Sequence, residues 1–151
     1  MMGPLSIITF LPALGALALI FVPQRAERAL RLAALAVTLM TFVLSIPLYF
    51  GFDGDAVDYQ FEELVPWMPS LGAGYHVGID GISLLLVLLT TFLMPIALAS
   101  AWHAVQDRVK EFVITLLVLE TGMLGVFVSL DLFLFYVFWE AMLIQIGRAH
   151  V

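Results

Sequence analysis

Two glutamates lie inside otherwise apolar stretches of this chain, and carboxylates in such positions can carry protons. Glu140 lies between Leu132 and Ile144, and Glu120 lies between Phe112 and Leu130. A charge at the centre of a bilayer costs at least ~2.5 kcal/mol on insertion scales, so it usually faces a protein interior or a hydrated cavity. A carboxylate balanced between desolvation and a nearby cation can take up and release a proton near neutral pH.

Five apolar stretches must position these glutamates. Four of them run for 19 to 22 residues with at most one charge: 4–22, 32–52, 81–102 and 112–130. Each is long enough to cross a hydrocarbon core of ~30 Å as a helix. The fifth stretch, 132–144, has only 13 residues. We therefore predict an all-α, polytopic transmembrane helix bundle with four complete helices and a truncated fifth.

The composition supports this class and excludes several others. Hydrophobic residues make up 63% of the 151 residues and charged residues 12%, and mean hydropathy is +1.09. A soluble domain carries more polar surface, and the strands of a membrane barrel alternate in polarity. The absence of cysteine excludes disulfides and cysteine-held iron–sulfur clusters. No basic patch, metal-ligand spacing or glycine-rich phosphate loop is present, so we expect no nucleic acid, metal or nucleotide to bind.

The distribution of basic residues predicts the orientation in the membrane. In the first 144 residues, basic side chains occur only in the first and third loops: Arg25, Arg28, Arg31, Arg108 and Lys110. The second loop, 53–79, is acidic and has neither lysine nor arginine. By the positive-inside rule, the first and third loops are cytoplasmic, and the N-terminus and the second loop are outside. We expect the second loop to lie as an extended, turned piece on the membrane surface, and Asp80 to cap the helix that follows.

Both glutamates are predicted at the same depth. Glu120 is nine residues beyond Glu111 at the cytoplasmic start of its stretch, and Glu140 is nine residues beyond Asp131 at the outer start of the next. Nine residues of helix rise ~13–14 Å, about half of the core. The carboxylates therefore reach the midplane on adjacent, antiparallel helices. The alternative for each is a structural glutamate held by hydroxyl or backbone donors, and Thr121 offers one beside Glu120.

Two segments resemble the antiporter-like membrane subunits of proton-translocating NADH–quinone oxidoreductase, respiratory complex I, and specifically the subunit M or chain 4 family. They are Gly78-Ile-Asp-Gly-Ile-Ser-Leu84 and the segment 119–144, which ends in the specific string Phe138-Trp-Glu-Ala-Met-Leu-Ile144. The resemblance extends from the N-terminus to Ile144.

The resemblance implies a larger helix bundle with inverted repeats, in which Glu140 is the proton-relay carboxylate and pairs with a lysine on a later helix. The resemblance also makes Glu120 a candidate second carboxylate, although this position is not acidic throughout the family. The parent complex uses NADH, FMN, iron–sulfur clusters and quinone to drive proton translocation, and this chain is expected to hold no cofactor itself. Expected partners are other membrane subunits of complex I, especially the paralogous antiporter-like subunits, together with the lipid bilayer. The expected location is the bacterial inner (cytoplasmic) membrane, as a multi-pass protein.

Two departures from the family are present. The chain stops after about a third of the family's length, so we expect residues 1–144 to be the N-terminal part of an antiporter-like domain that is inactive alone. Gln145 stands where the family usually has proline, and Ile146 to Val151 is the direct translation of a widely used sequencing adapter. We therefore hypothesise that 145–151 is a non-native tail.

Two other functions remain open from the residues. One is a subunit of a multi-subunit sodium/proton antiporter or a membrane-bound hydrogenase, and neighbouring genes would separate these from complex I. The other is a non-catalytic membrane scaffold, which predicts no effect of neutralising Glu140.

Overall fold

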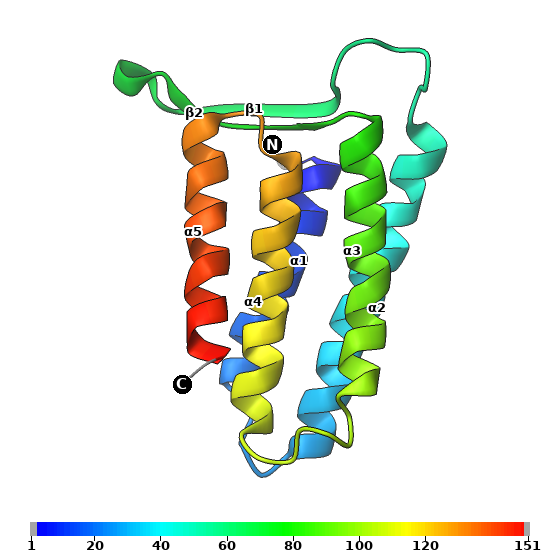
Figure 1. The fold of residues 1–151 in the computed structure, drawn as a ribbon, viewed down its shortest axis with the longest axis vertical. Coiled ribbons are helices and arrows are strands. Elements are labelled where there is room, and N and C mark those ends of the chain that lie inside the picture. The colour runs from blue at the N-terminus through cyan, green and yellow to red at the C-terminus, as the bar shows by residue number, and fades with distance from the viewer. Residues whose placement is uncertain (1–2, 150–151) are drawn as a thin grey trace.

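The computed structural model describes residues 3–149, which form five helices and a two-stranded hairpin (Figure 1). Their order is α1 (Pro4–Ile20), α2 (Glu27–Gly51), β1 (Gln60–Met68), a short 3-10 turn (Pro69–Leu71), β2 (Ala73–Ile79), α3 (Gly81–Ser100), α4 (Val109–Val128) and α5 (Leu132–Ala149). Among the described helices, α2, α3 and α4 are long and apolar enough to cross a membrane, while α1 and α5 are shorter apolar helices. The predicted all-α membrane bundle is confirmed, with the hairpin as an addition at one end.

Three helices extend beyond their predicted bounds, and one of them, α4, begins at Val109 rather than at residue 112. α2 begins at Glu27 rather than at residue 32, because its first turns carry charges that a purely apolar stretch leaves out. Arg31 is accommodated at the bundle end, where Nη2 donates a 2.6 Å hydrogen bond to the carbonyl of Val105 and the guanidinium lies 5.7 Å from the ring centre of Trp102. α5 runs past Ile144 to Ala149. His150 and Val151 of the predicted tail lie outside the described residues.

Lys110 closes the same end of the bundle, which we call the basic end. Its Nζ donates hydrogen bonds of 2.7 and 2.8 Å to the carbonyls of Ile20 and Val22. The last carbonyls of a helix have no partner within the helix, so this cation satisfies acceptors at the end of α1 and is favoured there by the helix dipole.

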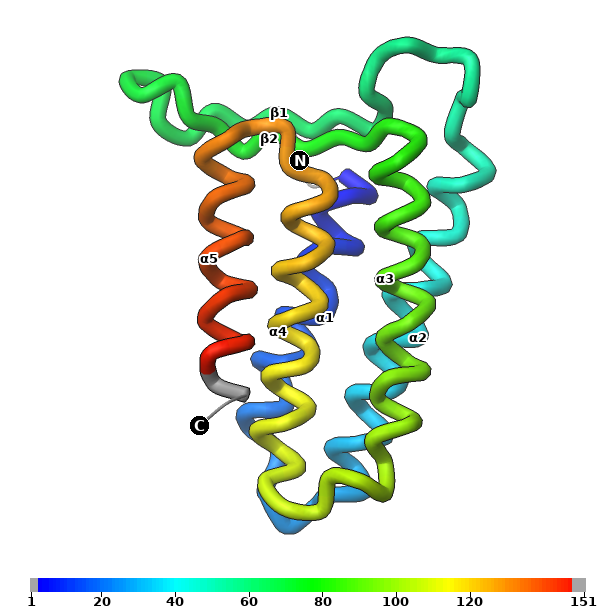
Figure 2. Tube along the Cα trace, in the orientation of Figure 1, coloured from blue at the N-terminus to red at the C-terminus, as the bar shows by residue number. Residues whose placement is uncertain are grey.

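The hairpin lies across the opposite end, which we call the hairpin end (Figures 1 and 2). β1 and β2 pair antiparallel with two register irregularities, and Gly72 takes a positive φ of 67° at the turn. The backbone N–H of Leu130 donates to the carbonyl of His76 at 2.8 Å, which attaches β2 to the link between α4 and α5. The predicted extended surface piece is therefore a strand pair fixed to the bundle.

Two aspartates cap helices at the hairpin end. Asp80 accepts a 2.7 Å hydrogen bond from the N–H of Ser83, as expected, and this bond holds the pKa of its carboxyl below the ordinary value. Asp131 accepts from the N–H groups of Gly74 (3.1 Å) and Phe133 (2.8 Å). Its pKa is lowered chiefly by the hydrogen bond from Gly74. Asp131 thus joins the hairpin to the start of α5.

Two separate apolar clusters form the interior. The first lies toward the hairpin end: Leu5, Ile8, Leu48, Val77, Ile79, Leu84, Val87, Leu124, Val128, Leu134 and Phe138. The second lies toward the basic end: Ala16, Leu19, Leu30, Ala34, Leu98, Val109, Val113 and Leu117. Helices α1 to α4 contribute to both clusters, so each of them passes through the space between the two.

Candidate functional site

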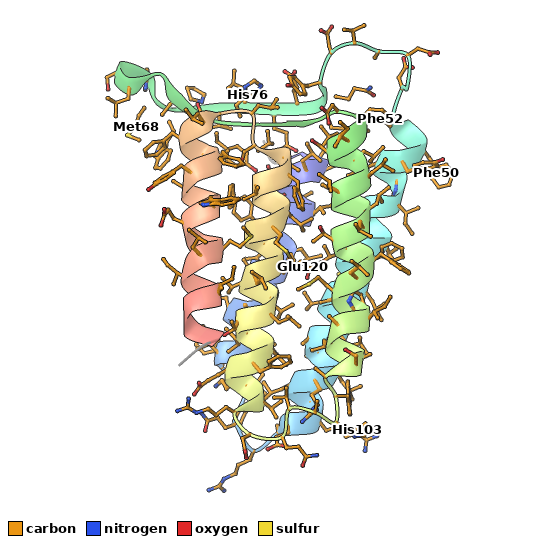
Figure 3. All side chains as sticks on the ribbon, in the orientation of Figure 1. Phe50, Phe52, Met68, His76, His103 and Glu120 are labelled. Carbon is orange, nitrogen blue, oxygen red and sulfur yellow. The ribbon has the colours of Figure 1, made fainter. Side chains whose placement is uncertain are left out.

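Glu120 lies midway along α4, inside the bundle. Figure 3 places it between His76 at the hairpin end and His103 at the basic end. Its relative exposure is 0%, and neither carboxyl oxygen has a hydrogen-bond partner among the described residues. Its face of α4 is shared with Leu117 and Leu124, which belong to the basic-end and hairpin-end clusters respectively. Glu120 therefore occupies the gap between the clusters.

Polar side chains fill that gap on all four helices, and we call them the polar layer. On α2, every buried residue between Ala34 and Leu48 carries a hydroxyl group. The other helices contribute buried hydroxyls or the carboxyl of Glu120 between the same two clusters. The members of the polar layer are Thr9, Thr38, Thr41, Ser45, Thr90, Thr91, Glu120 and Thr121. The outer face of a membrane helix bundle contacts lipid, so a polar layer in its interior is a candidate functional site.

Glu140 lies on α5, and its side chain is partly buried. It is eight residues from the start of α5 at Leu132, and Glu120 is eight residues from the end of α4 at Val128. Eight residues rise ~12 Å in either helix. Because α4 and α5 are antiparallel neighbours in Figure 1, the two glutamates lie at similar depth from the hairpin end.

The contact between α4 and α5 separates these glutamates. Gly125 lies against the ring of Phe138, so close that a methyl group there would overlap it. Gly122 lies against Met142, and a methyl group added to this glycine would lie 3.5 Å from the Met142 Cβ. At ~100° per residue, Glu120 lies roughly 140–160° around α4 from these glycines. It therefore faces away from α5.

Glu140 also faces away from this contact. It lies two positions after Phe138, which places it ~160° around α5 from that residue. Its neighbours one turn away on the same face, Tyr136 and Ile144, are 58% and 60% exposed. The two carboxylates therefore lie at similar depth on adjacent helices, as expected, but each points to its own side of the helix pair.

Curated relatives match most of this chain. No family profile matches it. It is 52% identical over 149 residues to NADH-quinone oxidoreductase subunit M of Rhodobacter capsulatus, a match that covers 95% of this chain and 28% of that protein. It is 43% identical over 133 residues to NADH-ubiquinone oxidoreductase chain 4 of Arabidopsis thaliana, covering 88% and 27%. Over most of its length the chain is homologous to proteins named subunit M or chain 4.

The chain spans less than a third of the length of these relatives. Chain 4 of Marchantia polymorpha gives a similar match, 39% identical over 140 residues, covering 93% of this chain and 28% of that protein. The family and the apolar helices together make this part of the chain a multi-pass membrane segment.

One set of hydrogen-bonded polar side chains, at the start of α1, was not predicted from the sequence. The carboxylate of Glu63, on β1, accepts hydrogen bonds from the N–H groups of Gly3 (3.1 Å), Leu5 (2.9 Å) and Ser6 (3.2 Å). It also accepts a hydrogen bond from the Ser6 hydroxyl, whose Oγ lies 2.6 Å from the Tyr75 hydroxyl oxygen. Burial raises the pKa of Tyr75. The acidic second loop predicts a solvated face for Glu63, and that prediction is wrong because its partners lie far away along the chain.

Metal binding finds no support in the described residues. Within residues 3–149, no group of three or more His, Cys, Asp or Glu side chains is arranged to hold a metal ion. His76 instead lies 3.5 Å from Glu62 on the neighbouring strand of the hairpin. The buried polar side chains of the described bundle carry carboxyl and hydroxyl groups.

Proposed function

We propose that this chain is part of the proton-translocating membrane subunit of an NADH–quinone oxidoreductase, and that Glu140 relays protons in that subunit. The observation that carries the proposal is an ionisable side chain halfway along an apolar helix, in a chain homologous to subunit M. Intramembrane carboxylates are costly, and they commonly mark proton or ion pathways.

The direction of Glu140 supports this role. The side chain lies on the face of α5 that α4 leaves uncovered, beside the exposed Tyr136 and Ile144. A cationic side chain from a helix outside this chain has room to approach it there. A nearby lysine would stabilise the ionised form against desolvation, and a change in their separation would release or bind a proton.

The wider assignment follows from the same proposal. NADH, FMN, iron–sulfur clusters and quinone belong to other parts of the complex, which drives the protons that this subunit carries. The partners are the other membrane subunits, including the paralogous antiporter-like ones. The membrane is the bacterial inner membrane, with the acidic hairpin end outside and the basic end in the cytoplasm.

The test uses the full-length subunit in its assembled complex, reconstituted in vesicles. Glu140→Gln keeps the shape of the side chain and removes its ionisation, so proton translocation and coupled quinone reduction should fall by roughly a hundredfold or more. Glu140→Asp, which keeps the acid, should be milder. Glu111→Gln at the exposed basic end is the matched control and should behave as wild type.

The amount of assembled complex is measured alongside, so that loss of assembly is not counted as loss of pumping. Wild-type proton translocation by assembled Glu140→Gln would overturn the proposed relay. It would also favour a scaffold role for this part of the chain.

A further inference from the structure

The polar layer contains three side chains with unused hydrogen-bonding capacity. Glu120, Thr9 and Thr121 have buried oxygens without a partner among residues 3–149. The other hydroxyls of the layer donate to carbonyls of their own helices, such as Thr41 to Val37 at 2.8 Å. A hydroxyl that donates once still has lone pairs that accept. In the layer around Glu120, acceptors therefore outnumber free donors, which are the hydroxyls of Thr9 and Thr121.

Two prolines add further acceptors at this level. Proline has no N–H, so the carbonyl four residues earlier loses its helical donor. In α1, Pro12 leaves the carbonyl of Ile8, next to Thr9, without that donor. In α3, Pro95 does the same to the carbonyl of Thr91, a member of the polar layer. Freed carbonyls in membrane helices are tolerated where a hydroxyl, a water molecule or a neighbouring helix satisfies them.

This environment favours one form of Glu120. An ionised carboxylate needs several donors and the layer has few free ones, while an enclosed charge with too few donors is costly in a protein interior. The neutral acid instead has a hydroxyl group that can donate to an acceptor of the layer. Glu120 is thus suited to hold a proton.

A line of buried polar atoms leads from this level to the hairpin end. Thr9 and Ser6 are one turn apart on α1, and their relative exposures are 1% and 2%. The Ser6 hydroxyl donates to the carboxylate of Glu63 and contacts the hydroxyl of Tyr75. Glu63 lies on β1 and Tyr75 on β2, and both residues are only partly buried.

The packing of α1 on α4 places Thr9 and Glu120 between the same two clusters, with Thr9 nearer the hairpin end. On the hairpin side, Leu5 and Ile8 of α1 share a cluster with Leu124 of α4. On the basic side, Ala16 of α1 shares a cluster with Leu117 of α4. Thr9 follows the first of these groups directly, and Glu120 lies between Leu117 and Leu124.

We propose that Glu120 is a proton-holding residue that exchanges its proton with the hairpin end of the protein through Thr9, Ser6 and Glu63. A proton leaves the carboxyl oxygen of Glu120, passes along hydroxyl groups and intervening water molecules, and reaches the carboxylate of Glu63, which releases it to solvent. The carboxylate left at Glu120 regains one proton from the same line, and no electrons move. This route is separate from Glu140, which lies across α4. Its use in pumping rests on the function proposed above.

The test measures exchange rather than pumping, in the full-length subunit within its assembled complex in membrane vesicles. The infrared carbonyl band of protonated Glu120 is identified as the band that disappears in the Glu120→Gln variant. The rate at which this band shifts after transfer to heavy water reports proton exchange at Glu120. Thr9→Val removes the hydroxyl at nearly constant shape and should slow the shift by roughly tenfold or more. Thr9→Ser keeps the hydroxyl and should exchange at the wild-type rate.

Thr115→Val is the matched control, because it removes a hydroxyl from the basic half of α4 and should leave the rate unchanged. Thr9 makes no side-chain hydrogen bond within residues 3–149, so its replacement removes no native contact of that kind, and Ser6→Ala tests the next step independently. Equal exchange rates in Thr9→Val and Thr115→Val would overturn the proposal. So would an infrared spectrum that Glu120→Gln leaves unchanged. Neither result depends on turnover, so failure here is distinct from wild-type pumping by Glu140→Gln.

Discussion

Glu120 and Glu140 differ in their surroundings although they lie at similar depth on neighbouring helices. Glu120 is enclosed by α1 to α4 within a layer of hydroxyl groups. Glu140 is partly buried on the face of α5 that no helix of the described part covers, beside exposed apolar side chains. The α4–α5 contact, built on Gly122 and Gly125, lies between them.

This difference shows that depth and direction are set by different features. The distance of a residue from the end of its helix fixes its depth, and the sequence alone supplies that distance. The direction depends on which face of the helix the small residues bring into contact, since membrane helices pack closely where side chains are small. The two glutamates therefore have different functions open to them: one can meet partners outside this chain and the other cannot.

Enlarging the glycine at the helix contact should have the largest effect. Gly125→Ala adds a methyl carbon that would lie 2.3 Å from the ring of Phe138, so α5 must move away from α4. We expect destabilisation of about 3 kcal/mol, at the upper end of the range for overpacked cores. Gly122→Ala is the matched control, because its methyl group would lie at ordinary contact distance from Met142. Thermal unfolding of both variants in detergent measures the difference, and equal midpoints would contradict the assigned contact.

Replacing each glutamate by leucine should separate their environments. Glu120→Leu removes a buried carboxyl group that lacks a partner within the described part of the chain, so we expect a gain in stability of about 1–2 kcal/mol. Glu140→Leu changes a partly exposed side chain and should alter stability by less than ~0.5 kcal/mol. Unfolding of the two variants under identical conditions checks this. Destabilisation by Glu120→Leu would mean that Glu120 makes a bond essential to the fold.

Removing the charge of Asp131 should have the smallest effect, limited to the hairpin and the start of α5. Asp131→Asn weakens hydrogen bonds from Gly74 and Phe133, so their amide hydrogens should exchange faster, whereas Asp58→Asn in the preceding loop should not change them. The folded-state pKa of Asp131 is lowered. Its stabilisation is therefore complete above the ordinary pKa and is lost as the pH falls through the lowered value. Exchange at Gly74 that is insensitive to acid would contradict this role.

The lengths of the apolar stretches predict most of the helix bundle, and the differences between predicted and observed elements have local causes. The start of α2 was missed because Arg28 belongs to the helix while its charge lies at the bundle end, where water remains accessible. The strands were expected only as an extended piece, because Pro66 and two register irregularities interrupt their pattern.

The candidate site could be predicted in part. The positions of Glu120 and Glu140 along their helices followed from counting, and the spacing of Gly122 and Gly125 could have indicated which face of α4 meets a neighbour. The spacing of Thr38, Thr41 and Ser45 matches one face of a helix and could have revealed the polar layer. The contact of Glu63 with Ser6 had no local signal.

Thiol labelling tests the opposed directions of the two glutamates most directly, because this chain contains no cysteine that would add background. Glu120→Cys and Glu140→Cys are prepared separately in the chain, with Ile144→Cys as an exposed reference, and each is treated in detergent with a small membrane-permeant thiol reagent. We expect position 140 to react at a rate close to that of position 144, and position 120 to remain unlabelled until the protein unfolds. Labelling at position 120 as fast as at position 140 would contradict the account.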